Sequence, residues 1–359
     1  MFEHIAKRRP PSSVPFAAIA VIIIGIVMVG FMIRTLSSGP AQDELGRDRP
    51  IRRDLAAQIP ELSPGLEAEV DPESKPVDVK FNWPPPCRVP AIQDTRKDGQ
   101  HSRASFHVVL EPAGDRLALR MQDVELLVVN GQRADSPEIA GQLASANALT
   151  AAAMPSFIVS TTGDYLGIAD LDRTLDVLAK SPALRGPEMA RALDAMRTPQ
   201  ARAMLEQAAG SYWNAWSAAW HGIQLAPGAH LERTSEIELA GGATMKVPST
   251  ITHKGTIPGT GGLVALESVQ VLEGPEAARQ MLAMLRSLAA QAGGPRPPDD
   301  AVKQFRREAI VRVAIDPVTS RVHRARTTMT VEVGTQQRTT MDDIAFDWAH
   351  AEGGGAKAP

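Results

Sequence analysis

The chain is short of cysteine and of net charge, and each shortage excludes a class of function. Its 359 residues contain one cysteine, Cys87, which cannot form an internal disulfide or a cysteine-based zinc site. Two interpretations of Cys87 remain open: a small residue packed in a proline-rich connector, or a reactive or dimer-linking thiol. The net charge of −3 provides no basic surface for a phosphate backbone, so no nucleic-acid partner is predicted.

The motifs that mark common catalytic sites are also missing. The sequence has no P-loop, no Gly-x-Gly-x-x-Gly after a strand, no Gly-x-Ser-x-Gly and no His-Glu-x-x-His. Residues Gly255–Gly262 (GTIPGTGG) resemble a phosphate loop but lack its Lys-Ser/Thr ending and precede a strand, which indicates a hairpin loop. The histidines are not spaced as metal ligands, and Asp342-Asp343 is interpreted as a solvated acidic pair. No catalytic residue, metal or cofactor is therefore predicted.

One long apolar run is present, Phe16–Ile33 (FAAIAVIIIGIVMVGFMI), and it contains no charged side chain. As a helix its 18 residues extend about 27 Å, close to the thickness of the hydrocarbon core of a bilayer. The run therefore predicts one transmembrane helix in contact with the lipid bilayer. A cleaved signal peptide is the alternative, but the run exceeds a usual signal core and Ser37-Ser38-Gly39 is a mediocre cleavage site. An uncleaved signal anchor is favoured.

The charges around this run indicate the orientation of the chain. Lys7, Arg8 and Arg9 precede it, which favours a cytoplasmic N-terminus and a translocated C-terminal part, although four arginines between residues 47 and 53 weaken the asymmetry. We expect a single-pass protein of the bacterial inner membrane with its C-terminal domain in the periplasm. The expected divisions are a cytoplasmic N-terminus (1–15), the anchor (16–33), a flexible linker (34–78), a folded domain (79–350) and a disordered tail (351–359).

Apolar residues alternate over much of the folded domain, and turn signals separate the alternating stretches. Strands are predicted at 105–111, 116–121, 124–129, 156–160, 165–168, 231–239, 243–247, 249–257, 263–272, 309–316, 321–333 and 338–348. Capping residues and a period near 3.6 predict helices at 137–153, 171–179, 187–196, 199–220 and 275–290. Strands followed by helices and then strands again, with hairpin turns throughout, predict an α+β fold with a mostly antiparallel sheet.

The most unusual cluster of side chains is an aromatic stripe on the helix predicted at 199–220. Tyr212, Trp213, Trp216 and Trp220 follow one another at helical spacing and include three of the five tryptophans. The stripe is interpreted as core against the concave side of the sheet. Two alternatives are a groove that binds a lipid, an acyl chain or a peptide, and an exposed patch for a neighbouring protein. We expect Trp213 and Trp216 to be core, and Trp220, at the helix end, to be partly exposed.

The order of elements resembles the LolA/LolB-like periplasmic lipoprotein carriers. The resemblance rests on the extended strands at Ser105–Met121, the hairpin Phe157–Ile168 with Gly163-Asp164 at its tip, the helices that follow, and the closing meander Ala309–Trp348. It implies an open half-barrel, a curved antiparallel sheet around helices that encloses an apolar cavity for acyl chains. No ligand residue of that family can be transferred to a position in this sequence. The membrane anchor suits a tethered acceptor or an envelope-complex subunit better than a diffusing carrier.

Two functions from different classes are compatible with these observations. The first is a non-catalytic, membrane-anchored envelope protein whose periplasmic domain binds a lipid or acyl chain, or scaffolds an envelope complex. Tyr212, Trp213, Trp216 and Trp220 are its candidate ligand-binding residues. The second is an envelope hydrolase or modifying enzyme with an active site that the sequence does not reveal.

Overall fold

A computed structural model describes residues 62–69, 76–97, 100–129, 131–136, 147, 154–181, 186–238, 244–291, 295–302, 305–334 and 336–353. The predicted anchor 16–33, the predicted cytoplasmic segment 1–15, most of the predicted linker and nearly all of the helix predicted at 137–153 lie outside these ranges. Within the described ranges, no helix is both long enough and apolar enough to cross a membrane.

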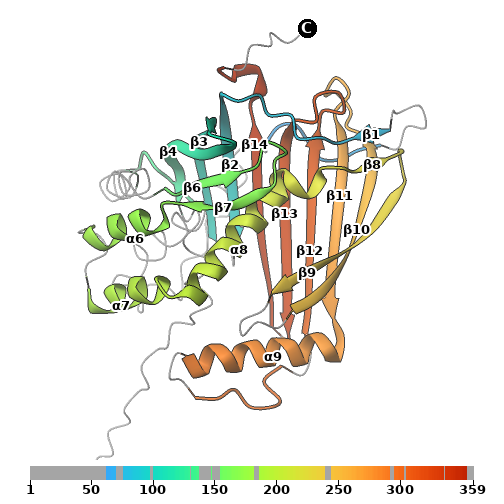
Figure 1. The fold of residues 1–359 in the computed structure, drawn as a ribbon. Helices are drawn as coiled ribbons and strands as arrows, with labels where there is room; N and C mark the ends of the chain where they lie inside the picture. The colour runs from blue at the N-terminus through green and yellow to red at the C-terminus, as the bar shows by residue number, and fades with distance from the viewer. Residues whose placement is uncertain are drawn as a thin grey trace, which may run out of the picture.

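Most of the described strands join one large antiparallel sheet (Figure 1). Its strands in spatial order are β7 (Tyr165–Ala169), β6 (Ser156–Val159), β4 (Arg116–Val129), β3 (Gln100–Ala113), β2 (Cys87–Lys97), β14 (Gln336–Phe346), β13 (Val322–Val333), β12 (Phe305–Ile315), β11 (Val264–Glu273), β10 (Thr244–Thr256) and β9 (His230–Glu238). β5 (Gln132–Arg133) pairs with β4 beside this path, and β1 (Val77–Asp78) pairs separately with β8 (Gln224–Leu225). No pairing among the described residues joins β7 to β9, so the sheet is open. The mostly antiparallel sheet is confirmed.

The helices lie where capping signals predict them. α6 (Leu171–Lys180), α7 (Pro187–Met196) and α8 (Pro199–Trp216) follow β7, and α9 (Gly274–Gln291) follows β11. Thr198 caps α8, since its side-chain oxygen accepts a hydrogen bond from the Ala201 amide. The helix predicted to reach residue 220 instead ends at Trp216. Ser217 leaves helical geometry there, and a short 3₁₀ turn, η2 (Ala218–Trp220), follows. A second 3₁₀ turn, η3 (Trp348–His350), follows β14.

Two pairs of predicted strands are single strands in the structure. The strands predicted at 116–121 and 124–129 form one β4, in which Asp123 has a positive φ of 52° near an irregularity in the pairing with β3. A bulge absorbs one extra residue without ending the strand. The strands predicted at 243–247 and 249–257 form one β10, which continues its pairing with β9 through Pro248.

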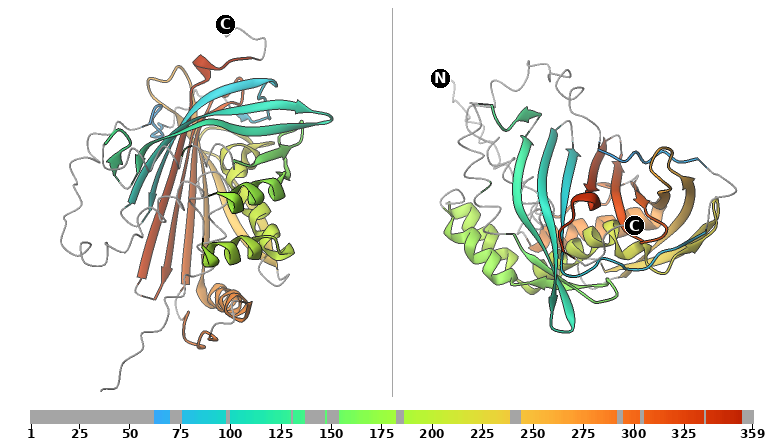
Figure 2. Two further views of the ribbon diagram at one scale, coloured as in Figure 1. Left: turned by 90° about the vertical axis from the view of Figure 1, so that its left-hand side faces the viewer. Right: turned by 90° about the horizontal axis from the view of Figure 1, so that it is seen from above.

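The alternation of side chains gives the sheet two faces. The inner face carries α8, and its buried residues include Val89 on β2, Val313 on β12 and Ile344 on β14, each at most 2% exposed. Helices α6, α7 and α8 all lie on one side of the sheet in Figure 2. α9 crosses the far end of the strands and packs on the inner-face residues Leu272 and Phe305. The two ends of the inner face are therefore covered by different helices.

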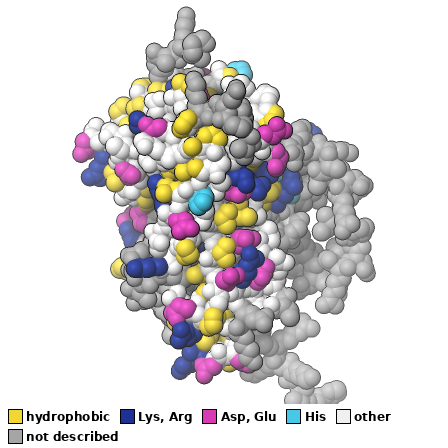
Figure 3. Space-filling model, turned by 90° about the vertical axis from the view of Figure 1, so that its right-hand side faces the viewer, with side chains coloured by type: hydrophobic (Ala, Val, Ile, Leu, Met, Phe, Trp, Pro, Cys, Tyr) yellow, Lys and Arg dark blue, Asp and Glu magenta, His cyan; other side chains and the backbone are white. Residues whose placement is uncertain are grey.

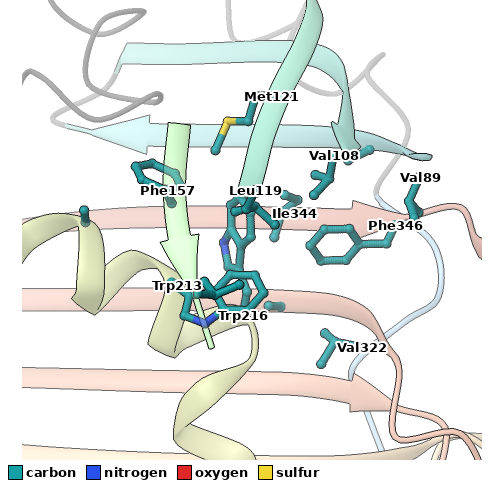
Figure 4. Close-up of a cluster of buried hydrophobic side chains, with 14 of the residues drawn as sticks. Val89, Val108, Leu119, Met121, Phe157, Trp213, Trp216, Val322, Ile344 and Phe346 are labelled. Carbon is teal, nitrogen blue, oxygen red and sulfur yellow. The ribbon is translucent and has the colours of Figure 1, made fainter. Parts of the chain in front are cut away.

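The main hydrophobic core lies between α8 and the upper part of the inner face (Figure 4). The rings of Trp216 and Phe346 lie 5.6 Å apart, edge to face, and Trp83 meets both Trp213 and Phe346 in the same manner. The hairpin β6–β7 closes one side of this core through Phe157. Large apolar surface is thus removed from water where helix and sheet meet.

The folded part begins earlier than residue 79. Residues 62–69, which fall in the predicted linker, pack on the outer face: Leu66 contacts Ala265 and Ala314, and Glu69 forms a bridge with Thr256. We call residues 62–69 the strap. Ala265 and Ala314 have small side chains, which leave room for Leu66. The composition of residues 34–78 did not predict this packing. At the other end, Glu352 pairs with Arg88, so the predicted tail is ordered at least to this residue.

Candidate functional site

The aromatic stripe is part of the core. Trp213 and Trp216 are 1% and 3% exposed, and the Trp213 indole N–H donates to the Gly163 carbonyl oxygen at 2.7 Å. The stripe continues through Leu205 and Ala209, which are also buried. Side chains packed this closely present no surface to a ligand, so the structure favours the core interpretation over the groove.

The partial exposure expected of Trp220 is wrong. Trp220 is 1% exposed, and its indole N–H donates to the Ala215 carbonyl oxygen at 3.1 Å. The reason is local: the chain leaves the α-helix at Ser217 and turns tightly through η2. Trp220 therefore does not continue the spacing of the helix and turns back into the core.

Tyr212 occupies a polar border of the core. Its hydroxyl donates to Gln93 Oε1 at 3.2 Å, and burial together with the charge of Asp342 holds its pKa well above the ordinary value. Asp342 accepts a hydrogen bond from the Thr95 hydroxyl at 2.7 Å, and burial raises the pKa of its carboxyl group. Tyr212, Gln93 and Asp342 thus form a polar group under α8.

The interpretation of Asp342-Asp343 as a solvated pair is also wrong. Neighbouring residues of a strand point to opposite faces, so Asp342 lies on the inner face and Asp343 on the outer face. Asp343 is 2% exposed and accepts hydrogen bonds from Arg324 and Arg326. The two carboxylates therefore cannot share one cation.

The inner face between α8 and α9 is the feature that the sequence did not reveal. Under α8, Val313 and Ala325 are 0% and 3% exposed. Farther along the same two strands, the inner-face side chains of Val311, Thr327, Met329 and Val331 are partly exposed. Val311 packs against the main core and Val331 against the α9 cluster, while Met329 belongs to neither. We call these four residues the inner strip.

One charged residue borders the inner strip. Arg307 on β12 pairs in register with Leu272 on β11 and Val331 on β13, so its side chain emerges among apolar neighbours. It is partly buried, and burial lowers the pKa of its guanidinium group. The alternation of side chains along β12 and β13 would have been enough to predict that Arg307 and Met329 lie on the same face of the sheet. Which part of that face α8 and α9 leave uncovered depends on tertiary packing.

The arrangement closest to a catalytic one is at the tip of the β6–β7 hairpin. Ser217 Oγ lies 3.1 Å from His221 Nε2, and the charge of Asp164 acts on His221. A catalytic triad needs the acid to accept a hydrogen bond from the second ring nitrogen, but His221 Nδ1 is buried and forms no hydrogen bond with any described residue. Ser217 is 3% exposed. Burial also lowers the pKa of His221, against the effect of Asp164. This geometry does not support acyl transfer.

The described residues contain no group of three or more His, Cys, Asp or Glu side chains placed to hold a metal ion. Cys87, the first residue of β2, is 3% exposed, and burial raises the pKa of its thiol to about 11. A buried thiol that stays protonated is a poor nucleophile, which favours the packing role of Cys87.

A shallow depression also lies on the outer face where the strap meets the β10–β11 loop. Its volume is about 460 Å³, and its lining residues are Gly65, Glu67, Ala68, Glu69, Ile257 and Pro258. Two carboxylates in so small a lining do not suit an acyl chain.

Comparisons with known proteins do not identify a family for this chain. No family model matches the chain, and no curated protein matches its sequence. A solved structure, described as lipid–protein interactions in lipovitellin, aligns with a TM-score of 0.38 and 8% identity. The alignment covers 77% of this chain and 26% of the lipovitellin chain. The resemblance to the LolA/LolB-like carriers is not confirmed by these comparisons.

Proposed function

We propose that the chain is a non-catalytic, membrane-anchored protein of the bacterial envelope whose folded domain binds a hydrophobic ligand, a lipid or an acyl chain, on the inner strip. One observation carries this proposal. On one sheet face, Val313 and Ala325 are at most 3% exposed under α8, whereas Val311, Met329 and Val331 are partly exposed around the small, buried Ala309. An apolar surface that the described helices leave partly open to water is typical of a ligand site.

The chemistry of the inner strip fits an acyl chain. Methionine is flexible and polarisable, and it adapts to ligands of variable shape. Met329 stands between Val311 and Val331 in this strip, with Ala309 beside it in the pairing of β12 and β13. An acyl chain laid along these strands would remove the remaining apolar surface from water, which is favourable by about 25 cal/mol per Å².

Anchoring is the second part of the proposal, and the apolar run 16–33 with its preceding basic residues supports it. The run would hold the folded domain in the periplasm, close to a source of lipid. Alkaline phosphatase fused after residue 350 should be active, whereas a reporter that works only in the cytoplasm should be inactive. The reverse pattern would refute the orientation.

A matched pair of variants tests the ligand site. Met329 lies on the inner face of β13, and Met341 on the outer face of the adjacent β14, and both are partly exposed. The full chain in a lipid nanodisc would be exposed to a 16-carbon alcohol with a photoreactive diazirine, and labelled residues on β13 would be quantified by mass spectrometry. Met329→Glu should reduce labelling of β13 at least about tenfold, because a carboxylate beside an acyl chain costs several kcal/mol.

Met341→Glu introduces the same charge on the opposite face and should leave labelling unchanged. Equal labelling of the wild type and both variants would contradict the proposed site, as would equal loss in the two variants.

A further inference from the structure

The charged side chains of the outer face are paired with one another. Arg306 on β12 contacts Glu273, Glu308 and Glu332 at 3.2, 2.9 and 3.6 Å. On the same strand, Arg312 contacts Glu267 at 2.6 Å. The side of the molecule shown in Figure 3 likewise carries basic side chains next to acidic ones. On the outer face, therefore, both Arg306 and Arg312 of β12 form ion pairs with nearby carboxylates.

The inner face of the same strand is different. Arg307, next to Arg306 in sequence, points to the opposite face, and no described residue forms an ion pair or hydrogen bond with its guanidinium group. Its cross-strand neighbours are the apolar Leu272 and Val331. A partly buried cation without a counter-ion is costly, so binding of an anion at Arg307 would be favourable.

Charges of both signs lie near the inner strip, and each of its acidic neighbours already has a partner. Arg338 pairs in register with Val331, and Lys97 with Thr340, so both lie on the inner face. The described acid of this face on β14 is Asp342, the cross-strand neighbour of Thr327, and it accepts a hydrogen bond from the Thr95 hydroxyl. On the adjacent helices, Glu206 of α8 accepts from Tyr165 and Ile168, and Glu276 of α9 is paired with Arg279. The inner strip thus combines apolar side chains with a positive charge.

We propose that the inner strip binds a long-chain fatty-acid anion, with the carboxylate on Arg307 and the alkyl chain along Val331, Met329 and Val311. This inference rests on the proposed function and specifies its ligand. A guanidinium group can hold a carboxylate through two parallel hydrogen bonds. The strip occupies two neighbouring strands, about 4.8 Å apart, a width that suits one alkyl chain rather than the two of a phospholipid.

The test compares two photoreactive 16-carbon probes, one acid and one alcohol, each with the diazirine near its polar end. The full chain in a nanodisc should be labelled on β13 about tenfold more by the acid, since only the carboxylate forms charge-assisted hydrogen bonds with the Arg307 guanidinium group. Arg307→Gln should abolish this preference and keep labelling by the alcohol. Arg306→Gln removes the neighbouring charge from the outer face and should keep the preference.

The outcomes separate this inference from the proposed function. Labelling of β13 by neither probe would overturn both. Equal labelling by the acid and the alcohol in the wild type would leave the hydrophobic site in place but overturn the role of Arg307. Competition by hexadecyl phosphate that is tenfold stronger than competition by palmitate would overturn the assignment of a carboxylate. A preference lost equally in Arg306→Gln would indicate a general charge effect and contradict the inference.

Discussion

The largest effects of mutation on the free energy of unfolding are expected at single buried residues, and the tryptophans of the core are the clearest case. Trp213, Trp216 and Trp220 are each at most 3% exposed. Replacing any of them by alanine should cost about 3–5 kcal/mol of unfolding free energy, because a large cavity replaces the ring. Urea denaturation of the three variants measures this cost. A Trp220→Ala variant much more stable than Trp216→Ala would show that Trp220 is not core.

Asp94 should make stability depend on pH. Burial alone would raise the pKa of Asp94, but hydrogen bonds from His101 and Arg103 outweigh it and lower the pKa to about 2. The ionised carboxylate therefore stabilises the fold fully above pH ~4, and this stabilisation of about 2 kcal/mol is lost as the pH falls toward ~2.

The matched variant for this prediction is Asp94→Asn, which cannot ionise. Between about pH 5 and pH 2 the wild type should lose about 2 kcal/mol more unfolding free energy than the variant does. Denaturant titrations at both pH values measure the difference. Parallel losses in the two proteins would contradict the role assigned to Asp94.

Among the elements, the strap is held by the buried side chain of Arg324 in addition to the packing of Leu66. Arg324, 1% exposed, donates to the carbonyl oxygens of Leu62 and Pro64 and pairs with Asp343 at 2.7 Å. Arg324→Gln should cost about 3–5 kcal/mol, since it breaks a buried ion pair, and should speed hydrogen exchange in residues 62–69.

Arg326→Gln is the control for this prediction. Arg326 also pairs with Asp343, but no hydrogen bond joins it to the described strap. The variant should be destabilised while exchange in residues 62–69 remains slow relative to Arg324→Gln. Equal acceleration in both variants would mean that Arg324 does not hold the strap.

Strand and helix patterns predict much of the fold because they depend on local sequence. Capping at Thr198 and the turn at Gly114, with a φ of 68°, place the start of α8 and the turn between β3 and β4 correctly. Features that depend on contacts between residues far apart in the sequence could not be predicted from local patterns. The strap is ordered through Arg324, which lies 260 residues away in sequence from Pro64. Among the described elements, α8 and α9 cover different ends of one sheet face, and the inner strip lies between them.

At the scale of the whole molecule, the described residues form an open antiparallel sheet with a packed core at one end of its inner face and a partly exposed apolar strip beyond it. The packed core contains the aromatic stripe, which the sequence analysis named as a candidate site. The inner strip contains residues that the sequence analysis did not name as candidates. The proposed ligand site therefore depends on where the helices end rather than on any motif.

The most direct measurement of this account is native mass spectrometry of the full chain purified from membranes, with extraction of any bound lipid. The wild type and Met341→Glu should retain an acyl species, because both leave the inner strip intact. Met329→Glu should lose it, because a carboxylate on the strip opposes an alkyl chain. A wild-type protein free of acyl species but bound to envelope proteins would contradict the account and indicate a scaffold.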